Sequence, residues 1–264
     1  MSSFNVLVAT DLTDEGLHLL REAGDIELSV VTPTYKDVRG AIKTAHALIT
    51  RDDVVIDAEL LQQAPGLRII ARMSAGLDNM DVETATARGI IIMNMPGVSA
   101  VAAAEHTLGL MIALSRKLII AHNSLKEGWW LLDRKRQAGT QLNGKTLGVI
   151  GLGRVGQRVA AYGLALGMKV IAYDPYINED YLPLEQVTLV GLGELLAESD
   201  FVTIHVPATR ETQLMFDART ISRMKQGARL INTSHGGVIH EEALVEALKE
   251  GHLAGAAVDV YTQE

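Results

Sequence analysis

The stretch KTLGVIGLGRVGQRVAAYGLALGMKVIAYDP, residues Lys145 to Pro175, decides how this chain folds. Its apolar run Thr146–Ile150 is typical of a buried parallel strand, and a G-x-G-x-x-G pattern follows directly. A helical pattern comes next, and a second apolar run, Lys169–Tyr173, closes the unit. The stretch therefore predicts a strand, a glycine turn, a helix and a second parallel strand.

The glycine turn is typical of a dinucleotide site, although such turns also occur where a helix merely packs tightly on a strand. Gly151 permits the tight turn, Gly153 lets the backbone approach a pyrophosphate, and Gly156 lets the helix lie close to the strand. The helix N-terminus then offers unpaired N–H groups and a partial positive charge to the phosphates. Asp174 ends the second strand, where a carboxylate accepts hydrogen bonds from the ribose hydroxyls and repels a 2′-phosphate. This context favours a nucleotide site that prefers NAD over NADP.

The composition is that of an α/β protein with a sizeable core, most simply arranged as two domains: 264 residues, 48% hydrophobic and 21% charged. The net charge of −8 argues against a nucleic-acid partner, and the basic triplet Arg134 to Arg136 is most simply a solvated loop. No apolar stretch is long enough to predict a membrane span. The absence of cysteine excludes disulfides and cysteine metal sites and is compatible with the cytoplasm, and no other metal-binding pattern is present.

Strand-like runs alternate with helical patterns along the chain, which predicts parallel sheets covered by helices on both faces. The expected strands form two sets: Phe4 to Ala9, Ile26 to Val31, Ala47 to Thr50, Leu67 to Ala71 and Ile90 to Met93; then Thr146 to Ile150, Val170 to Tyr173, Phe201 to His205, Leu230 to Asn232 and Ala256 to Val260. Pro96-Gly97 marks a boundary between the sets, and the pattern VAAAEHTLGLMIALSRKLIIAHNSLKEG after it predicts one long helix.

Five further segments carry a resemblance to a known family. They are ARMSAGLDNMD (71–81), NMPGVSAVAAAEHTLGLM (94–111), SDFVTIHVPATRET (199–212), LINTSHGGVIHEEAL (230–244) and AGAAVDVYTQE (254–264). Together with the glycine stretch they resemble the D-isomer-specific 2-hydroxyacid dehydrogenases, and within them most closely the D-3-phosphoglycerate dehydrogenase branch. The resemblance implies a flavodoxin-like substrate-binding (lid) domain at 1–97 and a Rossmann NAD-binding domain at 98–264. It implies hydride exchange between NAD and a small 2-hydroxy acid, such as 3-phosphoglycerate, in the cleft between the domains.

The resemblance also implies individual roles. In the nucleotide domain it places Arg154 and Val155 on the pyrophosphate, Asp174 on the ribose, Val206, Thr233 and His235 beside the cofactor, and Asp259 at the nicotinamide amide. In the lid it implies that the backbone N–H groups of Ser74, Ala75 and Gly76 hold the substrate carboxylate, as a nest-like anion site does. Arg72 stands beside this turn and either meets a substrate anion or forms an ordinary surface ion pair.

The sequence departs from the family pattern at the catalytic positions. The family supplies an arginine that grips the substrate, an acid/base histidine and a glutamate that orients this histidine. His235 stands in place of the arginine, and Glu264 occupies the position of the glutamate. The family's histidine lies further on, so the domain is C-terminally incomplete relative to the family. We expect the chain as given to turn over 2-oxo acids very slowly, because imidazole is mostly neutral at pH 7 and offers no bidentate fork.

Two other histidines have simpler interpretations than catalysis. His106 is expected to be packed or at an interface, and His205 to form a structural hydrogen bond near the cofactor. Two classes of function therefore stay open: a D-2-hydroxyacid dehydrogenase, or an NAD-binding sensor or partner subunit without that activity. The apolar helical pattern Val101 to Ile120 suggests a homodimer through the nucleotide domain, although the same helix could be buried within one chain.

Overall fold

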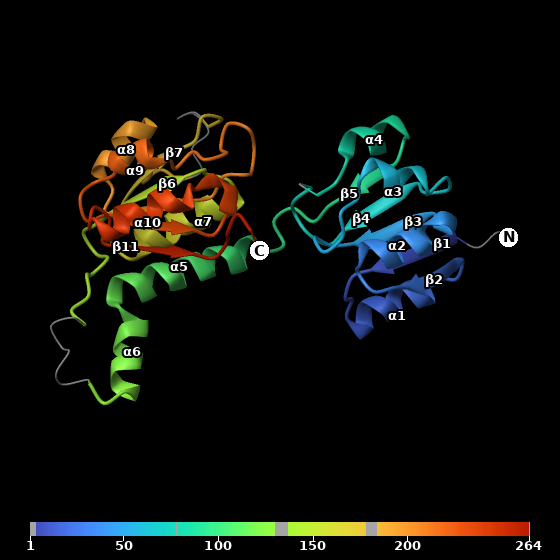
Figure 1. Cartoon of the computed structure of the whole chain (residues 1–264), viewed down its shortest axis with the longest axis horizontal. Coiled ribbons are helices and arrows are strands. Elements are labelled where there is room, and N and C mark those ends of the chain that lie inside the picture. The colour runs from blue at the N-terminus through green and yellow to red at the C-terminus, as the bar shows by residue number, and fades with distance from the viewer. Residues whose placement is uncertain (1–3, 78, 130–136, 178–183, 264) are drawn as a thin grey trace. The chain divides into compact units, whose positions relative to one another are not determined.

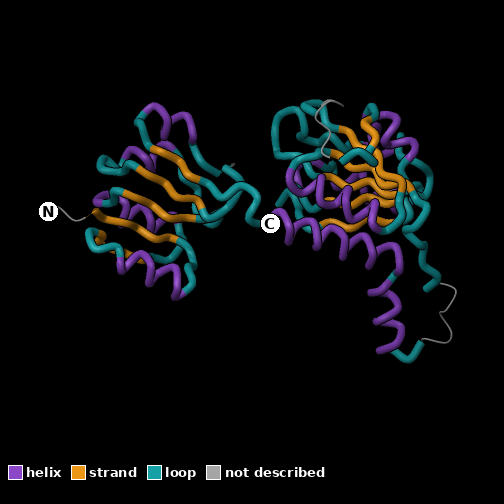
Figure 2. Tube along the Cα trace, turned by 180° about the vertical axis from the view of Figure 1, so that it is seen from behind, coloured by secondary structure: helices purple, strands orange, loops and turns teal. Residues whose placement is uncertain are grey.

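The computed structural model describes the chain apart from residues 1–3, 78, 130–136, 178–183 and 264. The chain divides into two compact units, Met1–Ser99 and Ala100–Glu264. Each unit is built on one parallel sheet with helices packed against it, and Figure 2 shows the strands of each sheet side by side. The expected α/β class is therefore confirmed. Among the described residues, none of the helices is both long and apolar enough to cross a membrane.

The first unit has a five-stranded sheet in the order β2-β1-β3-β4-β5. Its elements are β1 (Phe4–Ala9), α1 (Asp14–Glu22), β2 (Ile26–Val30), α2 (Tyr35–Ala41), η1 (Ile42–Thr44), β3 (Ala47–Thr50), α3 (Ala58–Gln62), β4 (Ile69–Arg72), α4 (Val82–Ala87) and β5 (Ile91–Met93). This order is that of flavodoxin-like sheets, as the sequence predicts.

Alternation along the strands gives this sheet two buried faces. In β1, Leu7 belongs to the larger core cluster, which residues of α2, α3 and α4 complete. Its neighbours Val6 and Val8 point the other way, into a smaller cluster that Leu20 of α1 completes. Successive side chains of a strand face opposite sides, so apolar residues at consecutive positions require cover on both.

The second unit has a six-stranded sheet in the order β11-β10-β9-β6-β7-β8. Its elements are α5 (Ala100–Arg116), α6 (Leu118–Lys126), β6 (Thr146–Ile150), α7 (Arg154–Ala165), β7 (Lys169–Tyr173), β8 (Thr188–Leu189), α8 (Leu192–Glu198), β9 (Phe201–Ile204), α9 (Ala218–Ser222), β10 (Arg229–Asn232), η3 (Gly236–Val238), α10 (Glu241–Lys249) and β11 (Gly255–Val258). This is the doubly wound Rossmann order, in which ligands bind where the winding reverses. Here the reversal lies between β6 and β9.

Helices cover both faces of the second sheet (Figure 1). Phe201 of β9 belongs to the cluster that contains residues of α5 and α7. The next residue, Val202, faces the cluster that α8, α9 and α10 complete. The sheet is therefore fixed between two apolar layers, and the polar side chains at the ends of its strands are held in place.

The structure corrects one expected element, because the long helical pattern after Ser99 is two helices. Lys117 between α5 and α6 adopts the left-handed conformation, with φ of 52°. The carbonyl oxygen of Ser115 accepts a hydrogen bond at 2.8 Å from the N–H of Thr140. Thr140 belongs to a later segment that returns to the end of α5. A long-range contact thus occupies a carbonyl near the C-terminus of α5 and helps to define where that helix ends.

Candidate functional site

The glycine turn after β6 leaves no room for side chains at two of its three glycines. Gly151 has φ of 87°, and a Cβ there would lie 2.6 Å from the carbonyl oxygen of His205. A Cβ at Gly156 would overlap the carbonyl oxygen of Gly151, so α7 lies directly against the turn. Gly153, the N-cap of α7, has open space around its Cβ position. Since no protein atom requires a glycine at 153, the open space there suits the close approach of a ligand.

Asp174 joins the end of β7 to this turn. Its Oδ2 accepts a hydrogen bond from the N–H of Leu152 at 2.9 Å, and its Oδ1 accepts one from the N–H of Tyr176 at 2.9 Å. Beside these groups lies a cavity of about 230 Å³. It is lined by Gly151, Gly153, Tyr173, Asp174, Pro175, Tyr176, His205, Val206, Pro207, Thr209, Glu211, Thr212 and Met215. The turn, the carboxylate and the cavity therefore form one site at the carboxyl ends of β6, β7 and β9.

His205 follows β9 and supports the wall of this cavity. Its Nε2 lies 2.9 Å from Oγ1 of Thr203, in agreement with the structural hydrogen bond expected from the sequence. Burial lowers the pKa of His205 to about 4, because the charged imidazolium loses its hydration. The ring is therefore neutral at pH 7, and it orients the backbone that leads to Val206.

The turn after β10 carries the predicted residues Thr233 and His235. Asn232 shapes this turn: its Oδ1 accepts from the N–H and Oγ of Ser234 at 3.0 and 2.8 Å, and its Nδ2 donates to the carbonyl of His235 at 3.0 Å. Thr233 shares a hydroxyl hydrogen bond of 2.7 Å with Thr107 of α5. The imidazole of His235 is half-buried and has no hydrogen-bond partner within the described residues. It is thus available to a ligand.

Asp259 follows β11 at the same edge of the sheet. Its N–H donates to the carbonyl of Asn232 at 3.0 Å, and its Oδ1 lies 3.1 Å from Nε2 of His106. The contributions of His106 and Thr107 to this edge were not predicted from the sequence. The available signal was the run of three polar residues, Glu105 to Thr107, within a mostly apolar helix. Only the packing of α5 against β10 and β11 shows which strand ends they reach.

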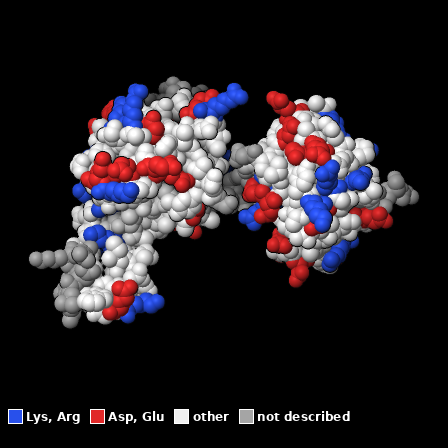
Figure 3. Space-filling model, in the orientation of Figure 1, with Lys and Arg blue, Asp and Glu red and all other residues white. Residues whose placement is uncertain are grey.

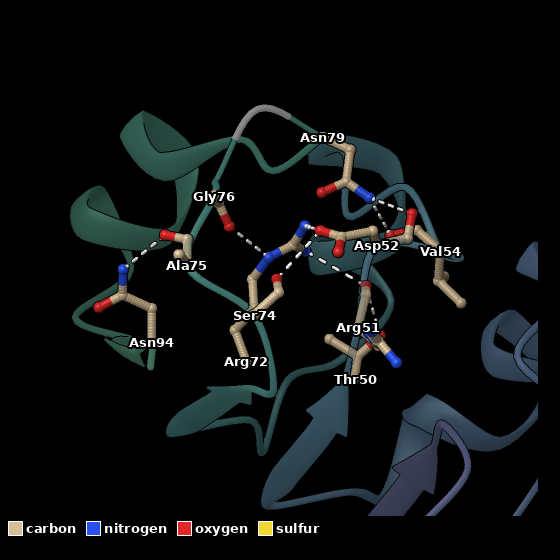
Figure 4. Close-up of polar contacts among 10 residues, drawn as sticks. All are labelled: Thr50, Arg51, Asp52, Val54, Arg72, Ser74, Ala75, Gly76, Asn79 and Asn94. Carbon is tan, nitrogen blue, oxygen red and sulfur yellow. Dashed lines mark hydrogen bonds and ion pairs between the residues drawn. The ribbon is translucent and has the colours of Figure 1, made fainter. Parts of the chain in front are cut away.

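The lid turn Ser74–Gly76 follows β4 in the first unit (Figure 4). All three of its carbonyls accept hydrogen bonds: that of Ser74 from the N–H of Met95 at 3.0 Å, that of Ala75 from Nδ2 of Asn94 at 2.8 Å, and that of Gly76 from the side chain of Arg72. The N–H groups of Ser74, Ala75 and Gly76, by contrast, have no acceptor within the described residues. Adjacent free N–H groups are what an anion-binding turn requires.

Arg72 supports this turn from inside the protein. Its side chain is 1% exposed, and its guanidinium donates to the carbonyl of Gly76 at 2.6 Å and to that of Arg51 at 3.3 Å. Its Nη2 lies 2.5 Å from Oδ1 of Asp52, which also accepts from Oγ of Ser74 at 3.0 Å. Of the two interpretations open from the sequence, the ion pair is the one the structure shows, although the guanidinium is buried rather than on the surface.

The other predicted positions lie in the second unit. The backbones of Arg154 and Val155 begin α7 directly after the glycine turn. Glu264 lies outside the described residues, as does the basic triplet Arg134 to Arg136. Within the described residues, no group of three or more His, Asp or Glu side chains is placed to hold a metal ion.

The sheet order, the glycine turn and the carboxylate at the end of β7 together define a dinucleotide-binding protein of the Rossmann class. The family model "D-isomer specific 2-hydroxyacid dehydrogenase, NAD binding domain" matches residues 108–264. The chain belongs to the D-isomer-specific 2-hydroxyacid dehydrogenases, as the sequence motifs indicate. These are NAD-dependent oxidoreductases.

Individual relatives agree with this assignment. D-3-phosphoglycerate dehydrogenase of Methanocaldococcus jannaschii is 42% identical over 98% of this chain and 49% of its own length. The chain thus spans about half the length of the curated relatives it matches. The TT0316 protein of Thermus thermophilus superposes with a TM-score of 0.91 at 38% identity, over 99% of this chain and 83% of its own. D-lactate dehydrogenase of Aquifex aeolicus, complexed with NAD and lactic acid, superposes with a TM-score of 0.87 at 34% identity, over 98% of this chain and 77% of its own.

Proposed function

We propose that this protein transfers a hydride between NAD(H) and a D-2-hydroxy acid or its 2-oxo acid. The observation that carries the proposal is the glycine turn joined through Leu152 to Asp174, beside a cavity at the carboxyl edge of the sheet. NAD, when bound, accepts or supplies the hydride. Oxidation of the alcohol moves the hydride from C2 to the cofactor and the hydroxyl proton to a general base.

The nucleotide unit offers a binding group for each part of the cofactor. The N–H groups of Arg154 and Val155 lie in the first turn of α7, where backbone donors and the helix dipole favour a pyrophosphate. Asp174 is assigned to the adenosine ribose, where its charge disfavours a 2′-phosphate. Val206 and Thr233 are assigned to the cofactor wall, where they follow β9 and β10.

The nicotinamide end is assigned to Asp259 and His235. The carboxylate of Asp259 is half-exposed and can accept from the carboxamide of the ring. His235, with its unpartnered imidazole, is assigned to the substrate carboxylate or carbonyl, the place of the family's arginine. A neutral ring gives this anion one hydrogen bond, whereas arginine gives two and a positive charge. Glu264 keeps the assignment of orienting an acid/base histidine, as the resemblance implies.

The lid turn is assigned to the substrate carboxylate. Its free N–H groups at Ser74, Ala75 and Gly76 form the anion site, and Arg72 holds the turn in shape through the carbonyl of Gly76. Both a phosphorylated and an unphosphorylated acid are candidates, since one relative is named for 3-phosphoglycerate and another was solved with lactic acid.

The direct test is oxidation of NADH by a panel of 2-oxo acids, followed at 340 nm. It should be run on the 264-residue chain and on a version extended to the family's full length. We expect reduction of at least one 2-oxo acid by the extended version and tight binding of NADH by both. Absence of turnover in the extended version, with NADH bound, would contradict the dehydrogenase assignment.

A second function is an NAD-binding protein without dehydrogenase activity, acting as a sensor or a partner subunit. The observation that favours it is His235, because an imidazole stands where the family has the permanently charged guanidinium that grips the substrate. The two functions differ in one measurable respect. Only the dehydrogenase converts a 2-oxo acid to its 2-hydroxy acid in a single-turnover experiment with the NADH-bound protein in excess.

We also propose a homodimer that forms through α6. Ser124 is the only buried residue of this helix among those described, whereas Leu118, Ile119, Ile120 and Leu125 are exposed. Figure 3 shows few charged side chains over α5 and α6 on the face in view. Apolar patches of this kind mark interfaces. Ile119→Glu should give a monomer in sedimentation, and Val245→Glu, which changes an exposed residue of α10, is the control.

A further inference from the structure

Asp52 links the anion turn of the lid to the buried guanidinium beneath it. One oxygen, Oδ1, accepts from both Nη2 of Arg72 and Oγ of Ser74. Figure 4 shows the carboxylate beside both side chains, with a dashed line to each. Its own backbone carbonyl accepts from Nδ2 of Asn79 at 2.8 Å, which fixes the backbone of Asp52. The carboxylate is therefore held at the place where the substrate is proposed to bind.

The charges around this turn do not favour a second anionic group on the substrate. Arg72 is 1% exposed and each of its three guanidinium nitrogens donates to the protein, so burial keeps its remaining N–H groups from a ligand. Asp52, by contrast, is 61% exposed. Arg51 is the exposed cation of this segment, and Figure 4 shows its side chain running away from Ser74. A ligand that binds at the turn therefore lies beside an exposed carboxylate, whereas the nearby guanidinium of Arg72 is buried.

We propose that Asp52 makes this site select unphosphorylated 2-hydroxy and 2-oxo acids over their 3-phosphorylated counterparts. The inference rests on the proposed function and narrows its substrate class. The turn's free N–H groups satisfy one carboxylate. A phosphate on C3 is only three or four bonds of about 1.5 Å from that carboxylate, so in any orientation it lies within about a Debye length of Asp52. The exposed carboxylate of Asp52 repels the two negative charges of the phosphate, and the charge of the buried Arg72 is already paired with that carboxylate.

The test compares hydroxypyruvate with 3-phosphohydroxypyruvate, because the two 2-oxo acids differ only in the phosphate. In the chain extended to full length, we expect kcat/KM for hydroxypyruvate to exceed that for the phosphate ester by at least about tenfold, mainly through KM. Asp52→Asn keeps an oxygen that accepts from Arg72 and Ser74 but removes the charge. It should shift the ratio towards the phosphate ester by at least about tenfold.

Asp53→Asn is the matched control, since it removes the neighbouring charge, and Asp53 forms no hydrogen bond or ion pair with the turn among the described residues. We expect a shift of the ratio of less than about threefold. Asp52→Ser is a second variant that keeps a hydroxyl acceptor if the asparagine variant fails to fold. The comparison of the two acids in the unmutated protein needs neither variant.

Two kinetic outcomes would overturn the inference. The first is that the unmutated protein prefers the phosphate ester, and the second is that the variants at 52 and 53 shift the ratio of kcat/KM values equally. In either case reduction of any 2-oxo acid keeps the proposed function. If no acid is reduced, the proposed function fails instead, and calorimetric titration of both acids into the NADH complex decides the inference. Tighter binding of hydroxypyruvate supports it, and tighter binding of the ester, or no binding of either, overturns it.

Discussion

The imidazole Nε2 of His106 lies 3.1 Å from Oδ1 of Asp259, which ties α5 to the end of β11 across 153 positions of sequence. Both side chains are about half-exposed, so the contact is accessible to a ligand. Because Asp259 is assigned to the nicotinamide carboxamide, His106 is expected to hold this carboxylate in its binding rotamer. The first prediction tests that relationship.

Replacement of His106 by Ala should weaken NADH binding by about fivefold, since one hydrogen bond of about 1 kcal/mol no longer fixes Asp259. His106→Gln should restore most of the affinity, because its amide nitrogen can donate to the same oxygen. Calorimetric titration measures both. If His106→Ala leaves the dissociation constant of NADH as it is in the unmutated protein, Asp259 does not depend on His106.

Cofactor preference should depend on Asp174. We expect NADH to bind more tightly than NADPH, because the carboxylate at the end of β7 repels a 2′-phosphate. Asp174→Ala should weaken the binding of NADH by about tenfold and reduce the difference in affinity between NADH and NADPH. The same change removes the hydrogen bond to the N–H of Leu152 and so also loosens the glycine turn. Titrations with both cofactors provide the measurement, and tighter binding of NADPH by the unmutated protein would refute the assignment.

His235→Arg should increase kcat/KM for a 2-hydroxy acid by at least about tenfold in a chain extended to full length. A guanidinium presents two donors and a permanent charge to the substrate carboxylate, whereas imidazole presents a single donor. The affinity for NADH should not increase with this substitution, and its measurement serves as the internal control. If the substitution alters neither turnover nor substrate binding, position 235 is not the anion clamp, and the function without dehydrogenase activity becomes the better assignment.

His205 should make the protein less stable in acid. Its pKa is lowered by burial to about 4, so between about pH 6.5 and pH 4 the unfolded chain binds a proton that the folded chain does not. The contribution of the neutral His205 to the free energy of unfolding is complete above about pH 6.5. Below about pH 6.5 it decreases by up to about 1.4 kcal/mol per pH unit.

Urea unfolding at several pH values between 5 and 7.5 checks this expectation. His205→Gln should be less stable than the unmutated protein at pH 7, because it disturbs the bond to Thr203, but its stability should fall less steeply with acid. Parallel pH profiles for the two proteins would show that His205 does not carry the acid sensitivity.

The stretch from Lys145 to Pro175 contained enough information to predict its own fold. A strand, a glycine turn and the helix after it depend on local requirements, such as the φ of 87° at Gly151 and the contact between Gly156 and the turn. The alternation of strands and helices in the rest of the chain likewise predicted two parallel sheets. Both orders, β2-β1-β3-β4-β5 and β11-β10-β9-β6-β7-β8, agree with the fold classes expected from the resemblance.

The sequence did not reveal the partners of the polar side chains or the break between α5 and α6. The sequence left open whether Arg72 meets a substrate anion or forms a surface ion pair, and only the folded lid shows that its guanidinium is buried against Asp52 and the carbonyl of Gly76. Beside the helix break at Lys117, a carbonyl near the end of α5 accepts a hydrogen bond from the distant Thr140. Periodicity records which face of an element is apolar, and local rules set turns and caps. Neither specifies which distant donor meets which acceptor, since that is decided when whole elements pack against one another.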